Sequence, residues 1–327
     1  MAVDVVLDLL SEMPTGRTVT ATDLSPPPMT PYGARFRAPE GLKPKSKAKA
    51  LTTIRTFGQL TAGLRALPDY LIIGTKRGGT TSLARWLLEH PEVRSLYPAR
   101  ETRKGTYYFD VNYGRGQGWY QSHFPTRIGH RLAERRHGRP LLLGEATPYY
   151  LHHPHAPMRA RQLVPGAKII ALLRHPVDRA HGHWAERSRQ GVETLDFEQA
   201  LEAEPRRLAG EEERMLADPA YVSFAHQHYS YIDQSRYTGG LSRWMTAYPR
   251  HQLLVLRSED LYAEPQAVYE VVLEFLGLRS HRPEELSGWN RVAKDNLDPI
   301  LRQQLFDELA PDVTAVAELL DRDMGWT

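Results

Sequence analysis

The sequence contains no cysteine among its 327 residues, which excludes disulfide bonds, thiolate metal sites and cysteine nucleophiles. It also has little net charge, +3, because 42 basic residues nearly balance 39 acidic ones. This balance gives no reason to predict binding to nucleic acid or to a charged membrane surface, so any anion site must be local. The lack of cysteine fits a cytoplasmic protein, and this is the location that we predict.

Long apolar runs are missing as well, since no segment approaches the roughly 18 apolar residues of a membrane-spanning helix. The apolar residues at the N-terminus are interrupted by Asp4, Asp8 and Glu12 and follow no basic segment, so we predict no signal peptide. Residues 1–67 contain a cluster of prolines and then closely spaced lysines, which indicates an N-terminal extension that is partly a flexible arm. We expect a single domain over residues 68–327.

Within that domain, short apolar runs alternate with helical segments. Residues 70–73 are an apolar run before a glycine-rich turn, and the apolar residues after the turn recur at helical spacing. Residues 168–173 begin a second unit of the same form, in which a turn leads into a helix expected over residues 177–189. This alternation predicts an α/β fold, a single domain with a central parallel sheet flanked by helices, akin to the P-loop kinases.

The turn after the first predicted strand carries the strongest functional signal. It reads Gly74, Thr75, Lys76, Arg77, Gly78, Gly79, Thr80, Thr81, Ser82. Glycines let the backbone approach an anion, and amide groups at the start of a helix bind phosphate. The spacing is nearly that of a Walker A loop, but Thr80 stands where the Walker lysine should be, and two cations come earlier. This suits a 5'-phosphosulfate, which carries less charge than a triphosphate and needs no metal.

Residues 68–83, PDYLIIGTKRGGTTSL, resemble the 5'-phosphosulfate loop of the heparan sulfate sulfotransferases and their bacterial relatives. That family uses 3'-phosphoadenosine-5'-phosphosulfate (PAPS) as the donor and releases 3'-phosphoadenosine-5'-phosphate (PAP). The resemblance implies that Lys76, Arg77 and the amide groups of residues 78–82 hold the phosphosulfate. The family's lysine position falls on Arg77, with Lys76 one residue earlier, which leaves open which of the two contacts the bridging oxygen.

A donor with a 3'-phosphate requires a second basic turn. Residues 174–184 resemble the family's 3'-phosphate motif, which implies that Arg174 binds this phosphate in bidentate fashion. Gly182 stands where the family has serine, so either a neighbouring group replaces the hydroxyl or the phosphate is bound more weakly. Taken alone, Arg174 would more often form a surface salt bridge. Both basic turns follow strands, however, and ligands of open α/β folds bind beyond the carboxyl ends of strands.

The family also uses a glutamate as the base that takes the acceptor's proton. Residues 108–110 match the end of the family's base segment, but an ungapped match places Gly105 at the position of the glutamate. We favour Glu101 as the base, because residues 100–102 look like the family's K-E-T if four residues are inserted. A solvated loop glutamate is the alternative for Glu101. Glu145 follows a strand in a segment similar to one of the bacterial relatives, and it is the other candidate base or an acceptor ligand.

The acceptor side is expected to include a set of polar and aromatic side chains, Tyr107, Glu145, Tyr149 and His152. Three close histidines, His152, His153 and His155, could suggest a metal site. No carboxylate lies beside them at ligand spacing, and sulfuryl transfer needs no metal, so we predict none.

We therefore predict in-line transfer of a sulfuryl group from PAPS to a hydroxyl or amine of a small molecule, sugar or glycoconjugate. One alternative is a P-loop nucleotide kinase, which the missing Walker lysine disfavours. The other is a non-catalytic nucleotide-binding protein, which Gly182 and the displaced Glu101 keep open. The sequence does not specify the acceptor, and it leaves open whether the protein forms a homo-oligomer.

Overall fold

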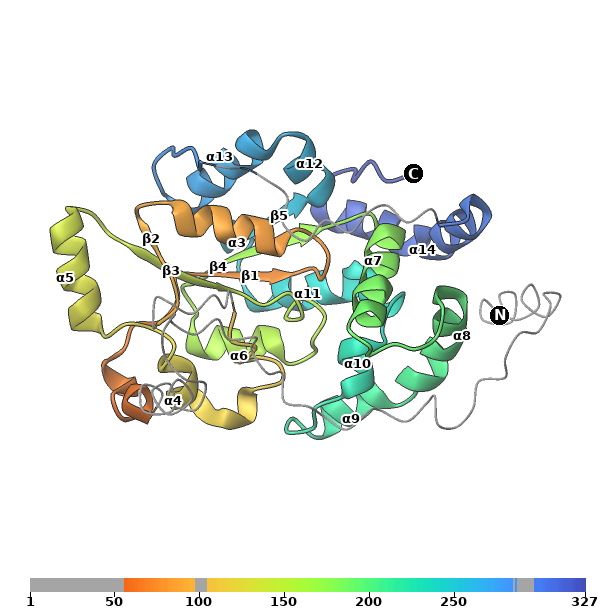
Figure 1. Cartoon of the computed structure of the whole chain (residues 1–327), viewed down its shortest axis with the longest axis horizontal. Coiled ribbons are helices and arrows are strands. Elements are labelled where there is room, and N and C mark those ends of the chain that lie inside the picture. The colour runs from red at the N-terminus through yellow and green to blue at the C-terminus, as the bar shows by residue number, and fades with distance from the viewer. Residues whose placement is uncertain (1–55, 98–104, 285, 287–296) are drawn as a thin grey trace.

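The computed structural model describes residues 56–97, 105–284, 286 and 297–327, and these residues form a five-stranded sheet with helices around it (Figure 1). The strands are β1 (Tyr70–Gly74), β2 (Val93–Arg94), β3 (Leu142–Ala146), β4 (Lys168–Leu173) and β5 (Leu253–Arg257). They lie in the order β2-β3-β1-β4-β5, and every pairing is parallel. Tyr70 pairs with Gly144 on one side and with Lys168 on the other. The predicted α/β class with a central parallel sheet is confirmed.

Helices cover both faces of the sheet (Figure 1). One face packs against α3 (Thr80–Glu89) and α13 (Pro265–Leu276), and the other packs against α6 (Ala156–Leu163) and α11 (Tyr237–Ala247). Neighbouring residues of a strand point to opposite faces of the sheet. Leu71 therefore packs in the hydrophobic core beneath α6 and α11, and Ile72 packs in the core beneath α3 and α13. Because both faces are buried, the strands read as continuous apolar runs rather than as alternating patterns.

The remaining helices lie around the sheet. The α-helices are α4 (Gly116–Gln121), α5 (Arg127–His137), α7 (Pro176–Arg189), α8 (Phe197–Leu208), α9 (Glu211–Ala217), α10 (Phe224–His228), α12 (Ser258–Ala263) and α14 (Pro299–Leu320). Four short 3₁₀ helices are η2 (Ala62–Leu64), η3 (Tyr113–Arg115), η4 (Asp233–Ser235) and η5 (Arg250–Gln252). Figure 1 shows that α7, α8, α9 and α10 gather beyond one end of the sheet, where β1 ends.

Local sequence signals set the helix boundaries. The helix α7 begins at Pro176, whose fixed φ suits the first helical turn. The helix α13 also begins with a proline, and Gly277 ends it with a left-handed φ of 77°. The helices predicted after the two basic turns are α3 and α7, and both are confirmed.

Of the predicted extension over residues 1–67, the structure describes residues 56–67 only. In this stretch the buried side chain of Arg65 donates a hydrogen bond from Nη1 to the backbone oxygen of Phe124, 2.6 Å away. None of the described helices combines the length and the apolar character that crossing a membrane requires.

Candidate functional site

The loop between β1 and α3 is attached closely to the end of the neighbouring strand β4. The amide of Thr75 donates to the backbone oxygen of Leu172 at 2.8 Å, and a Cβ at Gly78 would lie only 2.6 Å from that same oxygen. Gly79 has a left-handed φ of 92°, which glycine adopts without strain. Glycine is required at residue 78 because the loop packs closely against β4, and it is favoured at residue 79 because the chain turns sharply into α3. Residues 80–82 then form the first turn of that helix, where its dipole favours an anion.

Lys76 is the buried cation of this loop, with only 6% of its surface exposed. Its Nζ donates to the backbone oxygen of Gln227 and lies 3.5 Å from Nε2 of His183. The ammonium also lies 5.1 Å from the centre of the Tyr149 ring. Burial, and then the charge of Arg187, lower the pKa of Lys76 well below its usual value. An anion bound beside Lys76 would favour the charged form, so this environment is suited to a negatively charged ligand.

The two basic turns predicted from the sequence meet in the structure. Arg174 lies just after β4, and its Nη1 donates to the backbone oxygen of Arg77 at 3.3 Å. The Arg77 guanidinium forms an ion pair with Glu186 of α7 at 3.4 Å. Burial lowers the pKa of Arg77, although Glu186 opposes this effect. The sequence analysis missed Glu186, which lies one helical turn after Gly182 on the same face of α7.

Gly182 lies between these two arginines. A Cβ at this position would be 3.3 Å from Nη1 of Arg174 and 3.6 Å from Cβ of Arg77. The first of these atoms is the end of a flexible side chain, so a small residue fits after a shift of a few tenths of an ångström. A hydroxyl at residue 182 would therefore stand beside both cations.

We expect Gly182→Ser to strengthen PAP binding about three- to tenfold, because one added hydrogen bond to a charged group contributes about 1 kcal/mol or more. Titration calorimetry with PAP measures this change. Gly182→Ala is the matched control, since it adds the Cβ without the hydroxyl, and it should leave the affinity unchanged or slightly weaker. Equal affinities of the serine and alanine variants would show that the hydroxyl does not reach the ligand.

Glu145 is a buried carboxylate that holds a loop in place. Its Oε2 accepts hydrogen bonds from the amide and the hydroxyl of Thr106, at 2.6 and 2.7 Å. Its Oε1 accepts from the hydroxyls of Tyr120 and Tyr150, at 3.0 and 3.1 Å. Burial raises the pKa of Glu145, while these four hydrogen bonds act in the opposite direction. The carboxylate already has four donors, so this geometry favours a role in anchoring over contact with an acceptor.

The packing around Gly105 shows why the ungapped family match cannot supply a base. A Cβ at Gly105 would lie 2.2 Å from the backbone oxygen of Ala146, so no glutamate can stand there. Glu101, the predicted base, lies outside the described residues. Tyr107 is partly buried, and its amide donates to the hydroxyl of Thr147 at 3.3 Å.

Asp110 is a second functional candidate that the sequence analysis did not single out. It is 2% exposed, and its Oδ2 has no hydrogen-bond partner among the described residues. Its pKa is raised to about 8, mainly by burial and also by the charge of Glu145, while the hydrogen bond from the amide of Val111 and the charge of Lys76 act in the opposite direction. Its place at the end of the family-like segment 108–110 was the signal that could have identified it.

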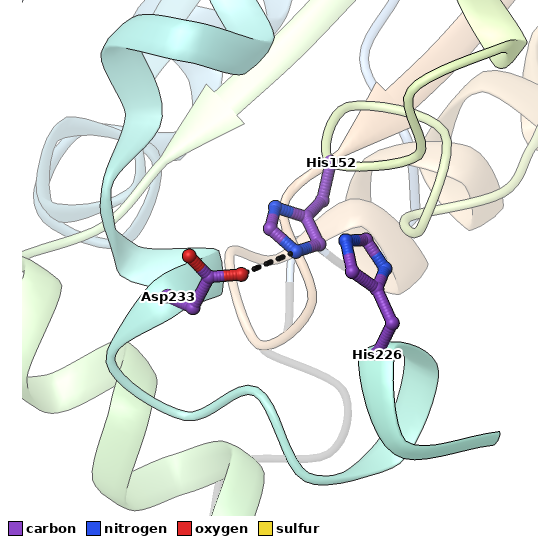
Figure 2. A group of neighbouring side chains, drawn as sticks. All are labelled: His152, His226 and Asp233. Atoms are coloured by element: carbon purple, nitrogen blue, oxygen red, sulfur yellow. Dashed lines mark ion pairs between the residues drawn. The ribbon is translucent and has the colours of Figure 1, made fainter. Parts of the chain in front are cut away.

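The three close histidines of the sequence do not form one group. His152 lies 3.1 Å from Oδ2 of Asp233 and stacks on His226, with the ring centres 4.3 Å apart (Figure 2). His155 instead lies 2.7 Å from the backbone oxygen of Met215 through its Nε2. A carboxylate nevertheless reaches His152, that of Asp233 from a distant part of the chain, which spacing along the sequence could not predict.

Tyr149 connects this histidine pair to the donor loop. Its hydroxyl lies 2.6 Å from Nδ1 of His226, and its ring is the one that faces Lys76. The structure thus places Tyr149 beside Lys76, and His226 links Tyr149 to His152.

A parallel sheet with two adjacent strands that end in cationic turns, the first of them rich in glycine, defines an α/β protein of the P-loop type. The family profile described as Sulfotransferase domain matches residues 67–310, and the chain belongs to this family. It is therefore an enzyme that transfers a sulfuryl group. This confirms the family that the loop after β1 predicted.

Known relatives agree with this assignment. The chain is 32% identical over 219 residues to the human bifunctional heparan sulfate N-deacetylase/N-sulfotransferase 3, and the match covers 66% of this chain and 23% of that protein. It is 25% identical over 352 residues to the membrane-associated sulfotransferase kil1 of Dictyostelium discoideum, covering 88% of this chain and 71% of that protein. The chain thus spans less than a quarter of the human relative.

The fold has a counterpart among solved structures. A sulfotransferase from Alicyclobacillus acidocaldarius superposes with a TM-score of 0.59 at 25% identity, and the match covers 79% of this chain and 97% of that chain.

Proposed function

We propose that this enzyme takes the sulfuryl group from PAPS and transfers it in line to a hydroxyl or amine of a small-molecule, sugar or glycoconjugate acceptor. The meeting of the two basic turns, through the hydrogen bond from Arg174 to the backbone of Arg77, carries this proposal. PAPS has two anionic ends, a 5'-phosphosulfate and a 3'-phosphate, and the two turns offer two adjacent groups of cations. A nucleoside triphosphate has one anionic end and fits this arrangement less well.

The donor would be held by residues of both turns. Lys76, Arg77 and the start of α3, residues 78–82, would bind the phosphosulfate, while Arg174, beside Gly182, would bind the 3'-phosphate. Of the two loop cations, Lys76 is proposed to contact the bridging oxygen, because it faces Tyr149 on the acceptor side. Arg77 lies next to Gly182 and Arg174, which supports a place nearer the 3'-phosphate.

In this mechanism a base removes the acceptor's proton as the acceptor atom attacks sulfur. The bond between sulfur and the bridging oxygen breaks, and PAP leaves with its new charge stabilised by Lys76. Glu101 is the proposed base, and Glu145 is proposed to position Thr106 and Tyr107 rather than to take the proton. The donors that surround the Glu145 carboxylate support this assignment.

The acceptor side is proposed to include Tyr107, Tyr149 and His152. Heparan sulfate appears in the name of the human relative, which supports a sugar-containing acceptor without specifying it. Residues 1–67 are proposed as an extension of the catalytic domain at residues 68–327. A cytoplasmic location is proposed as well.

The proposal is tested by calorimetric titration of the full chain with PAP and, separately, with ATP and magnesium. We expect PAP to bind and Arg174→Ala to weaken binding by about 10- to 100-fold, because a charge-assisted hydrogen-bond pair is lost. Arg206→Ala, which removes an exposed arginine of α8, is the control and should bind PAP like the wild type. Binding of ATP with magnesium in place of PAP would favour the P-loop kinase. PAP binding without sulfuryl transfer from PAPS to any acceptor in a broad screen would contradict the proposed reaction.

A further inference from the structure

A cluster of three potential metal ligands lies next to the donor loop. It consists of His152, His226 and Asp233, and their donor atoms lie within 4.8 Å of one another (Figure 2). Each residue comes from a different segment, since His226 belongs to α10, Asp233 begins η4, and His152 follows β3. We propose that these side chains bind a divalent transition-metal cation of the zinc type.

The positions of the donor atoms suit such an ion. In zinc sites, bonds of about 2.1 Å in a tetrahedral arrangement place neighbouring donors roughly 3.4 Å apart. The Nε2 of His152 and the Oδ2 of Asp233 are already 3.1 Å apart. The ring of His226 is stacked on that of His152 with an angle of 17° between the planes, so one imidazole must turn for both lone pairs to reach the same ion. Two imidazoles and one carboxylate are a ligand combination that zinc accepts readily.

The environment of His226 provides a second, independent observation. Its side chain is 2% exposed, and its Nε2 has no hydrogen-bond partner among the described residues. Its other nitrogen, Nδ1, lies 2.6 Å from the hydroxyl of Tyr149. When Nδ1 carries the proton and donates it to Tyr149, Nε2 presents a lone pair to the cluster. Metal-binding histidines are typically oriented in this way by a partner of the second nitrogen.

The charge states of the ligands agree with metal binding. Burial, and then the charge of His152, lower the pKa of His226 well below its usual value, so the imidazole is neutral. Burial raises the pKa of Asp233, but the hydrogen bond and charge of His152 outweigh it and lower the pKa to about 2. His226 and Asp233 are then in the states that a metal ion requires, and the proton that His152 shares with Asp233 is released when the metal binds.

A simple ion pair explains the cluster less completely. The contact between His152 and Asp233 accounts for two of the three residues. It leaves the buried Nε2 of His226 without a partner, and such a group costs about 1–3 kcal/mol. A cation between the three side chains would supply that partner.

The location of the cluster connects it to the reaction. The helix α10 that carries His226 also carries Gln227, whose backbone oxygen accepts a hydrogen bond from Lys76. With three protein ligands, a tetrahedral ion keeps a fourth position for water or an acceptor oxygen. The metal site itself does not depend on the proposed donor, because none of its ligands is assigned to PAPS.

The test uses the full chain, freed of metal with a chelator and then titrated with Zn²⁺ by calorimetry and with Co²⁺ by visible absorption. We expect one ion per chain and the absorption bands of tetrahedral cobalt. His226→Asn is the most specific variant, because it removes Nε2 and leaves an amide near the former Nδ1 for Tyr149. It should lower the affinity by more than the roughly 10- to 100-fold typical of losing a partner outside the ligand set.

His155→Asn is the matched control, since His155 is close in sequence but points to Met215, and it should bind the metal like the wild type. Asp233→Asn is the second ligand variant, should His226→Asn fail to fold by circular dichroism. The proposal would be overturned if the folded wild type bound neither metal. It would also be overturned if both His226→Asn and Asp233→Asn bound the metal as tightly as the wild type. PAP titration of the same samples separates this result from the proposed donor chemistry, because PAP binding is expected with or without the metal.

Discussion

Lys76→Met is expected to lower kcat for sulfuryl transfer by about 10²- to 10³-fold, the range typical of removing one group that stabilises transition-state charge. The same variant should be at least as stable to heat as the wild type. Burial makes the charged form of Lys76 costly in the folded protein, and this cost disappears when the ammonium is removed. A preorganised anion site is expected to contain such a residue, which lowers the stability of the folded protein but raises kcat.

The pH dependence of stability provides a separate check of the same residue. The folded-state pKa of Lys76 is lowered, so between this pKa and about 10.5 the unfolded chain binds more protons than the folded chain. The wild type therefore gains stability from this group as the pH rises. The thermal advantage of Lys76→Met should be largest at neutral pH and should shrink towards pH 10.

Lys168→Met is the matched control for this experiment. Lys168 also donates to a backbone oxygen, that of Phe275, and its Nζ lies 5.4 Å from the centre of that residue's ring. It stands at the start of β4, at the opposite end of the sheet from the donor loop. Its replacement should leave kcat within a factor of about two. A kcat of Lys76→Met that stays within threefold of the wild type would show that Lys76 does not act on the transferred group.

Glu145→Ala is expected to reduce the free energy of unfolding by about 4 kcal/mol, because four buried donors lose their acceptor and a cavity remains. For a domain of this size such a loss lowers the melting temperature by roughly 10 °C, which calorimetry or circular dichroism measures. Glu202→Ala, which removes an exposed glutamate of α8, is the control and should change the melting temperature by about 1 °C or less.

Glu145→Gln distinguishes an anchoring role from a catalytic one. If Glu145 is an anchor, the glutamine variant should melt at a lower temperature than the wild type. The NH₂ group of glutamine is a donor and would face hydroxyl and amide groups that donate to the carboxylate. The variant's kcat below the melting transition should remain within about tenfold of the wild type, because general-base catalysis itself contributes about 10²- to 10⁴-fold. An unchanged melting temperature with a kcat reduced by more than a hundredfold would show instead that Glu145 is the base.

The sequence alone determined the parts of the site that are continuous in the chain. The apolar run at residues 70–73 and the glycines after it specify a buried strand and a close-packed turn, and Pro176 specifies the helix after Arg174. These are local constraints on φ, ψ and burial, so residue types a few positions apart are enough to express them. The rule that ligands of α/β folds lie at the carboxyl ends of strands then predicted both basic turns at one edge of the sheet, whereas the adjacency of β1 and β4 came only from the tertiary structure.

The tertiary structure alone decided which distant side chains complete the site. The pairing of Arg77 with Glu186, the four donors around Glu145, and the approach of Asp233 to His152 all join residues that no short motif contains. Spacing along the chain describes one strand or one helix at a time. The convergence of separate segments depends on how the crossover helices pack against the sheet and against one another, and that packing is decided by burial over the whole domain.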